Sequence, residues 1–191
     1  MAQPNMNDLQ WRRDTSHGTF VASTKPLLLD LDFINSAFAS EDMDWARPLP
    51  KDQLATMLSQ SITLGLYEVQ PSVPPAASVD EPSSPRTPSP TMEEPFQGDM
   101  KQIGLARFIT DHVTTAYLTD VYVLPAYRKY GLGKWLISCC QDVLRKLPAV
   151  RRIMLVATPV VGKAFYAREL GMWDFHEESE SKIVMTRKAY A

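Results

Sequence analysis

Residues 116–134 read AYLTDVYVLPAYRKYGLGK, and this stretch decides the fold. Its first eight residues are rich in β-branched and aromatic side chains, which predicts a β-strand. Pro125 ends this strand, because proline has no N–H to donate to a sheet. The order is therefore a strand, a basic turn with two glycines, and a helix over residues 131–147. The apolar residues of that helix recur at one-face spacing: Leu132, Trp135, Leu136, Cys139, Cys140, Val143 and Leu147.

The turn between the strand and the helix has the properties of an anion site. The first turn of a helix leaves backbone N–H groups without partners and carries a positive partial charge. Glycines let a ligand approach the backbone closely, and Arg128, Lys129 and Lys134 add positive charge. The sequence therefore predicts a phosphate or pyrophosphate site. The spacing matches neither the G-x-x-x-x-G-K-[ST] loop nor the G-x-G-x-x-G dinucleotide pattern.

The pattern Arg-x-x-Gly-x-Gly, after a strand that ends Val-Tyr-Val-Leu-Pro, resembles the acetyl-CoA signature of the GNAT superfamily of N-acyltransferases. Residues 164–172 are similar to the family segment A-x-x-F/L-Y-x-x-x-G-F, with Met172 where Phe is usual. The Asn that often precedes this segment is replaced here by residues 158–162, Thr-Pro-Val-Val-Gly. The resemblance implies acetyl-CoA as co-substrate. It implies that these residues bind it: Val121, Tyr122, Val123, Arg128, Lys129, Tyr130, Gly131, Leu132, Gly133 and Lys134.

Length and composition limit the classes of protein to consider. The chain has 191 residues, which is typical of one domain, so we predict a single domain over 1–191. Hydrophobic residues make up 45% of the chain, enough for a core. The formal net charge is −2, so no basic field argues for a nucleic-acid partner. No apolar run approaches ~20 residues, so no membrane span or membrane partner is expected.

Cysteines, histidines and the N-terminus bear on compartment and metal. Residues 1–19 lack an apolar stretch with a cleavage site, so no secretory signal is predicted. Cys139 and Cys140 are adjacent on one predicted helix, where their side chains diverge by about 100°, so a disulfide between them is unfavourable. This fits a reducing compartment, and the cytoplasm is the default expectation, with the nucleus left open. The histidines show no metal-ligand spacing, so no metal is expected: His17, His112 and His176.

Hydrophobic periodicity predicts an α/β (α+β) fold, with residues 1–18 loose. The order resembles the whole GNAT fold: a mixed, mostly antiparallel sheet of six to seven strands flanked by about four helices. The predicted strands cover 20–24, 61–69, 102–109, 115–123, 152–157 (short and buried), 172–175 and 183–186. The predicted helices cover 30–40, with Asp30 as N-cap, and 51–60, 131–147 and 162–170.

Residues 70–99 differ in composition from the rest of the chain. Eight prolines lie among Ser, Ala, Thr, Glu and Asp, and such a segment buries too little apolar area to offset its ordering entropy. We predict a flexible insertion between two strands, not a domain boundary. The Ser-Pro and Thr-Pro pairs of residues 84–90 could be phosphorylation sites, and a plain spacer explains them equally well.

The resemblance implies transfer of an acetyl group from acetyl-CoA to an amine. Tyr166 stands at the tyrosine of the family segment and is the candidate general acid for the CoA thiolate; the alternative is a core aromatic. Asp120 is a carboxylate in an apolar strand and the candidate base, because burial disfavours its charged form; the alternative is a structural acceptor. Strand alternation predicts Tyr117, Thr119 and Val121 on the other face. If that face looks into the acceptor pocket, Tyr117 and Thr119 replace Asp120, through a water.

The first two helices and their loop are expected to form the acceptor pocket. Its candidate walls are Phe38, Trp45 and Tyr67, and the acidic residues 41, 42 and 44 could attract a cationic amine. The alternative is a set of core and surface residues with no ligand.

Three functions remain open from the sequence. The leading prediction is an N-acetyltransferase for a primary amine of a small molecule, acting by direct attack in a ternary complex. The others are a protein acetyltransferase acting on a lysine or an N-terminus, and a non-catalytic acetyl-CoA-binding regulatory module. A homodimer is left open as well.

Overall fold

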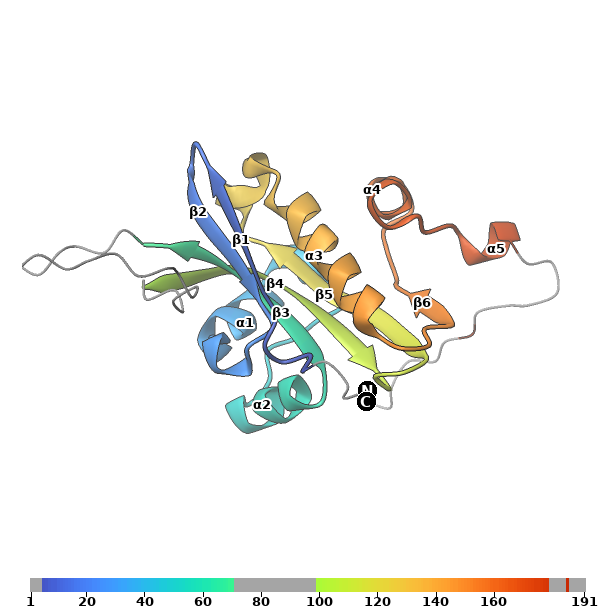
Figure 1. Cartoon of the computed structure of the whole chain (residues 1–191), viewed down its shortest axis with the longest axis horizontal. Coiled ribbons are helices and arrows are strands. Elements are labelled where there is room, and N and C mark those ends of the chain that lie inside the picture. Colours follow the sequence, from blue (N-terminus) through green and yellow to red (C-terminus); the bar gives the residue numbers. More distant parts are fainter. Residues whose placement is uncertain (1–4, 71–98, 179–184, 186–191) are drawn as a thin grey trace, which may run out of the picture.

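The computed structural model describes residues 5–70, 99–178 and 185, and six strands of this part form one sheet (Figure 1). The strands lie side by side in sequence order. Neighbouring strands are antiparallel from the first to the fifth, and the sixth is parallel to the fifth. The predicted mixed, mostly antiparallel sheet is therefore confirmed. The strands are β1 (Gln10–Thr15), β2 (Gly18–Ser23), β3 (Ile62–Val69), β4 (Met100–Thr110), β5 (Thr115–Val123) and β6 (Arg152–Met154).

Helices cover both faces of the sheet, with α1 and α2 on one side and α3 on the other (Figure 1). Asp30 is the N-cap of the first helix, as predicted: its Oδ1 accepts hydrogen bonds from the backbone N–H groups of Asp32 and Phe33. The α-helices are α1 (Leu31–Phe38), α2 (Lys51–Ser59), α3 (Leu132–Lys146), α4 (Val161–Leu170) and α5 (Phe175–Glu178). The short 3₁₀ helices are η1 (Pro26–Leu28), η2 (Glu41–Met43) and η3 (Pro125–Tyr130).

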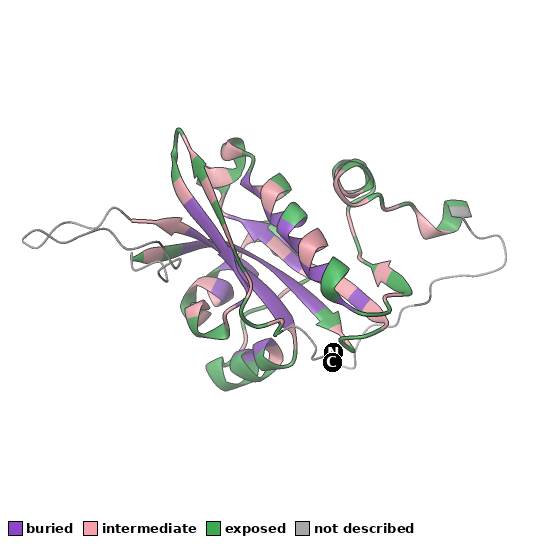
Figure 2. Cartoon of the chain, in the orientation of Figure 1, coloured by how far each residue is buried: buried purple, intermediate pink, exposed green. Residues whose placement is uncertain are grey.

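The sheet separates two apolar cores, and burial is concentrated along its central strands and α3 (Figure 2). The larger core lies between the sheet and α3, and includes Phe108, Leu118 and Leu136. The smaller core lies between the sheet and the first two helices, and includes Leu105, Tyr122 and residues of both helices. Each face of β4 and β5 therefore has its own layer of helices.

The prediction that residues 1–18 are loose is wrong for residues 10–18. They form β1 and the start of β2, joined by a two-residue turn that pairs Thr15 with Gly18. The outer strand alternates exposed and half-buried residues and carries several charges, so its apolar pattern is too weak to indicate a strand. Its pairing with β2 supplies the missing signal, because an edge strand needs hydrogen bonds on one side only.

The predictions for the C-terminal part are partly wrong. The strand predicted at 152–157 has three residues, and Arg152 and Met154 are exposed. No strand forms at 172–175; residues 172–174 are irregular and α5 begins at Phe175. The strand predicted at 183–186 lies outside the described residues, apart from Met185, which is in no strand. The helix predicted at 162–170 is confirmed as α4, and Gly171 follows it in the left-handed region with φ 64°.

The predicted insertion at about 70–99 lies outside the described residues, apart from its two ends. These ends meet: the backbone N–H of Gln70 donates to the Asp99 carbonyl oxygen over 2.8 Å, and Val69 pairs with Met100. The segment between them therefore connects neighbouring ends of two antiparallel strands. Within the described ranges, no helix is long and apolar enough to cross a membrane.

Candidate active site

The basic turn after β5 forms the uncapped start of α3. Residues 125–130 make the 3₁₀ helix η3, and Gly131 follows in the left-handed region with φ 69°, which a side chain would strain. No side chain caps the first N–H groups of α3. A Cβ on Gly131 or Gly133 would meet no atom within 4 Å, so space for a ligand lies next to this backbone. The geometry is that of an anion site at a helix N-terminus.

Arg128 holds this turn against the loop between α1 and α2. Its Nε donates to the Val123 carbonyl oxygen at 2.9 Å, and its Nη2 donates to Asp42 Oδ2 at 2.6 Å. The guanidinium also lies 5.8 Å from the centre of the Tyr122 ring. The hydrogen bond from Arg128 lowers the pKa of Asp42. Asp42, expected to attract an amine, is therefore paired with the arginine of the turn.

The tip of the β1–β2 hairpin also contacts the turn. The His17 ring stacks on the Tyr130 ring, with centroids 4.2 Å apart and planes 20° from parallel. Lys129 Nζ lies 5.3 Å from the Tyr130 ring centre on the same turn. Tyr130 is thus held between chain segments far apart in the sequence, which fixes the turn that leads into α3.

A cleft of about 380 Å³ lies beside the start of α3. Lys134 reaches across it to Glu169 of α4, with Nζ and Oε2 3.6 Å apart. Glu169 also accepts from Arg168 Nε at 2.6 Å. The cleft continues the anion site along α3, between this helix, β1 and α4. Its lining residues are Arg13, Gly131, Lys134, Trp135, Ser138, Gln141 and Glu169.

Asp120 lies at a bulge in β5. The register between β4 and β5 shifts between Leu105 and Arg107, and Asp120 has φ 51°, rare for a residue other than glycine. Asp120 is 5% exposed, and its carboxylate accepts three hydrogen bonds. The donors are Arg107 Nε at 2.6 Å, Thr119 Oγ1 at 3.1 Å and Trp45 Nε1 at 3.4 Å. Because these donors surround it, the structure supports Asp120 as an organising group more than as a free base.

The bulge makes the predicted alternation of β5 wrong at its centre. Thr119 lies on the same side as Asp120, since its hydroxyl donates to the carboxylate. Val121 lies on the other side, where it packs against the α3 core, while Tyr122 packs against the α1–α2 core. Strict alternation fails because Asp120 is the extra residue of the bulge.

The strands β5 and β6 pair only over a short length. Their register joins Thr115, Ala116 and Tyr117 to residues 152–154, and within the described part of the chain no strand pairs with residues 118–123 on that edge. The edge therefore offers backbone N–H groups beside the turn that starts α3. Such N–H groups can stabilise a negative charge that develops on a carbonyl oxygen.

Tyr166 lies on α4 and packs against the α3 core. Its ring meets Phe165 edge-on, with centroids 5.1 Å apart. Burial, with a smaller contribution from Cys140, raises the pKa of Tyr166 to about 12. The phenol therefore stays protonated at neutral pH. In the stretch where the family often has Asn, Thr158 Oγ1 accepts a hydrogen bond from the Gly162 N–H at 3.0 Å.

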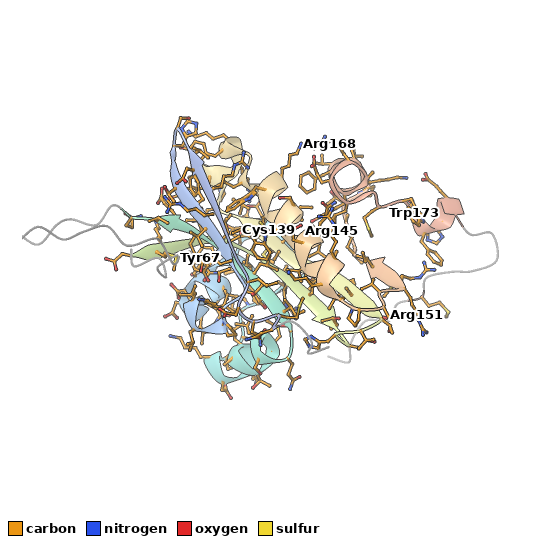
Figure 3. The ribbon with its side chains drawn as sticks, in the orientation of Figure 1. Tyr67, Cys139, Arg145, Arg151, Arg168 and Trp173 are labelled. Atoms are coloured by element: carbon orange, nitrogen blue, oxygen red, sulfur yellow. The ribbon has the colours of Figure 1, made fainter. Side chains whose placement is uncertain are left out.

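The three candidate walls of the acceptor pocket are not brought together. Phe38 is buried in the α1–α2 core. Tyr67, labelled in Figure 3, is 1% exposed, so it offers no surface to a ligand. Trp45 is 57% exposed and donates a hydrogen bond to Asp120. Of the three candidates, it is therefore the one that lies between the Asp120 carboxylate and solvent. Tyr117 and Thr119 are half-buried on the same strand.

The cysteines are not suited to carry an acyl group. Both thiols are free and buried in α3, and burial raises the pKa of Cys139 to about 12. A thiol that stays protonated is a weak nucleophile. Within the described residues, no group of three or more His, Cys, Asp or Glu side chains could hold a metal ion.

Comparisons with known proteins identify the family. The model of the acetyltransferase (GNAT) family matches residues 91–172, which contain the turn, α3 and Tyr166. A Gibberella zeae protein, named as an acetyltransferase, is 36% identical over 162 residues, covering 85% of this chain and 84% of its own length. The chain belongs to the GNAT family. It is therefore an acetyltransferase, and GNAT proteins use acetyl-CoA as co-substrate.

Solved structures resemble the fold over most of the chain. A Xanthomonas campestris pv. campestris protein, named as a GNAT acetyltransferase, has a TM-score of 0.58 and 26% identity, and the match covers 86% of this chain and 93% of that one. A Staphylococcus aureus protein has a TM-score of 0.52 and 15% identity over 87% and 99% of the two chains, which bears on the fold alone. The GNAT fold predicted from the turn is thus confirmed.

Sequence reasoning missed several residues of the site. Arg107 is the partner of Asp120, and its signal was present: it is the single basic residue of the predicted strand 102–109, and the next predicted strand has a single acidic residue. His17, Arg13 and Glu169 reach the turn or the cleft only through tertiary contacts. No local sequence pattern indicates such contacts.

Proposed function

We propose that this GNAT protein transfers the acetyl group of acetyl-CoA to a primary amine of a small molecule, by direct attack in a ternary complex. The observation that carries the proposal is that the uncapped N-terminus of α3 follows the end of β5 whose edge β6 leaves unpaired. Acetyl-CoA supplies the thioester. Backbone N–H groups of residues 131–134 would bind its pyrophosphate, with Arg128, Lys129 and Lys134 adding charge.

The described side chains divide the remaining tasks. Tyr166 donates its phenolic proton to the departing thiolate, since its raised pKa keeps the phenol protonated at neutral pH. A backbone N–H on the free edge of β5 stabilises the negative charge on the carbonyl oxygen. Asp120 and Thr119 orient the acceptor amine or a water that takes its proton. A small acceptor is favoured because Asp120 is almost fully buried beneath Trp45, where a bulky surface does not reach.

A panel of amines tests this function. The purified chain is incubated with acetyl-CoA and small amines, lysine-containing peptides, or buffer alone, and released CoA is measured with a thiol reagent. The proposal expects release with small amines well above that with peptides. Release only with peptides would make the protein a protein acetyltransferase. Acetyl-CoA binding without turnover of any amine would favour a regulatory module.

A further inference from the structure

Arg107 has hydrogen-bond donors that the described part of the chain does not use. It is 8% exposed, and its Nε donates to Asp120 Oδ2 at 2.6 Å. Its two Nη atoms make no hydrogen bond within the described part of the chain. Among described side chains, only Tyr67 has a polar atom both sealed from solvent and without a partner. The Nη atoms of Arg107 are therefore within reach of solvent.

The edge of the guanidinium that carries the two Nη atoms can bind a carboxylate through two parallel hydrogen bonds that form a fork. Arginine presents five N–H groups in one plane, and its two Nη atoms carry parallel N–H bonds on the edge away from the chain. Asp120 occupies the Nε position and holds the plane fixed. Two parallel N–H donors match the two oxygens of a carboxylate.

Arg107 lies on the face of the sheet that α1 and α2 cover. The residues around it on that face, described next, are called the shelf. Thr63 and Thr119 are the register partners of Arg107 on the neighbouring strands. Trp45, which hydrogen-bonds to Asp120, rises beside it. Two positions further along the strands, side chains of the same face are exposed. An apolar row is left open there: Ile109 (48% exposed), its partner Tyr117 (half-buried) and, paired with Tyr117, Met154 (42% exposed).

We propose that Arg107 determines acceptor specificity by binding a carboxylate, so that the acceptor is a small amine with a carboxylate and an apolar body. This inference rests on the proposed function, because it names the acceptor class for that reaction. The carboxylate binds the Nη edge, the apolar body lies on the shelf, and the amine lies toward the free edge of β5.

The charges around the shelf fit a zwitterion. Asp120 is paired with Arg107, and Asp42 is paired with Arg128. The exposed carboxylates of Glu41 and Asp44 lie on the loop that carries Trp45, where they favour the ammonium form of an arriving amine. An acceptor without a carboxylate would leave the Nη edge to water alone.

Matched acceptor pairs test the proposal with the wild-type protein. Each amino acid is compared with its carboxamide: phenylalanine, leucine, β-alanine and 4-aminobutyrate, which vary the amine–carboxylate separation. Calorimetric binding and kcat/KM are both measured. For at least one pair the acid should be preferred about tenfold or more, the size of one charge-assisted hydrogen bond. Amides used as well as acids in every pair would overturn the proposal.

Three variants assign the preference to Arg107. Arg107→Lys keeps the charge and loses the fork, so the acid preference should fall to about threefold or less. Arg107→Met with Asp120→Leu removes both charges, avoids a lone buried carboxylate, and should abolish the preference. Arg145→Lys, at an exposed arginine on α3 (Figure 3), is the matched control and should leave the preference unchanged. A full preference in folded Arg107→Lys and in the double variant would overturn the assignment.

Binding and turnover separate this inference from the proposed function. If acids bind better than amides but none is acetylated, the carboxylate site stands and the proposed reaction fails. If the amines are acetylated without preference for the acid, the proposed reaction stands and the carboxylate site fails. Acetyl-CoA affinity, measured for each variant, shows that the cofactor turn is intact.

Discussion

Two regions of the molecule are built in different ways. One is the sheet with its helices α1, α2 and α3, and the other is the C-terminal arm, residues 152–178. Seven residues of α3 are buried, and the central strands are buried on both faces (Figure 2). No described residue from 152 to 177 is buried. Large apolar side chains of the arm face solvent instead, among them Val156, Val161 and Trp173. Trp173 is labelled in Figure 3.

The two regions carry different parts of the candidate site. The anion turn, Arg107 and Asp120 belong to the sheet and the start of α3. Tyr166 belongs to the arm, which is tied to α3 by a hydrogen bond from Gln141 Nε2 to the Glu169 carbonyl and by half-buried packing of Phe165 and Tyr166. We infer that the sheet sets the stability of the fold, while the arm places one chemical group. Variants in each region test this division.

The largest effect is expected in the core. Phe108 is 1% exposed in the sheet–α3 core, so Phe108→Ala should lower the free energy of unfolding by about 3–5 kcal/mol. Phe165→Ala in the arm is the matched change at a half-buried site and should cost about 1–2 kcal/mol. Urea unfolding followed by circular dichroism measures both. Equal losses would show that the arm is part of the same cooperative core.

Tyr166→Phe should leave stability nearly unchanged and lower kcat by about 10²-fold or more, because the ring is kept and the proton is lost. The Kd for acetyl-CoA should stay the same. With a pKa near 12, the wild-type phenol is protonated through the usual assay range, and its contribution should decline only above about pH 11. Stopped-flow kinetics isolate the chemical step. A kcat within a few-fold of wild type would make Tyr166 a packing residue.

Gly133→Glu should lower acetyl-CoA affinity by roughly tenfold or more, because a carboxylate beside the α3 N-terminus repels phosphate. A Cβ at position 133 meets no atom within 4 Å, and glycine is a poor helix former, so the fold should be kept or stabilised. Gly133→Ala is the control for bulk without charge. Calorimetry that gives wild-type affinity for Gly133→Glu would remove the pyrophosphate from this turn.

The smallest effect is expected for deletion of residues 72–96, with a short turn joining the ends. The hydrogen bond from Gln70 to Asp99 already brings the flanking strands together, so loop closure should change stability by only about 1–2 kcal/mol. Acetyl-CoA binding should persist. Thermal unfolding and calorimetry check both, and a chain that no longer folds would show that the segment belongs to the domain.

The sequence predicted the elements whose signals are local. The helix over 131–147 has an uninterrupted apolar face, Asp30 is a good N-cap, and Gly131 and Gly171 stand where left-handed backbone is needed. The mixed, mostly antiparallel sheet with flanking helices followed from the resemblance of the chain to GNAT proteins. Such features depend on a few neighbouring residues, so one sequence is enough to find them.

The rest depends on contacts between distant segments. The outer strand β1 has no alternating apolar pattern, and its place is set by pairing with β2. Asp120 was expected as a lone carboxylate, but Arg107 and Trp45 come to it from a neighbouring strand and a loop. The predicted strand at 172–175 did not form: among the described residues no strand pairs with residues 172–174, and propensity without a partner does not make a strand.

The bulge at Asp120 also limits how this strand can change in evolution. The extra residue shifts the alternation of side chains along β5 by one position. The residues before and after the bulge therefore face the correct core only because this residue lies between them. Loss of that residue would restore a regular ladder and exchange the layers of Tyr122 and Val123, placing the phenol against α3. Substitution at position 120 removes a carboxylate, whereas a deletion there moves the side chains of half the strand to the opposite face of the sheet. Insertions and deletions should therefore be rare in relatives at this point, even where the acid itself varies.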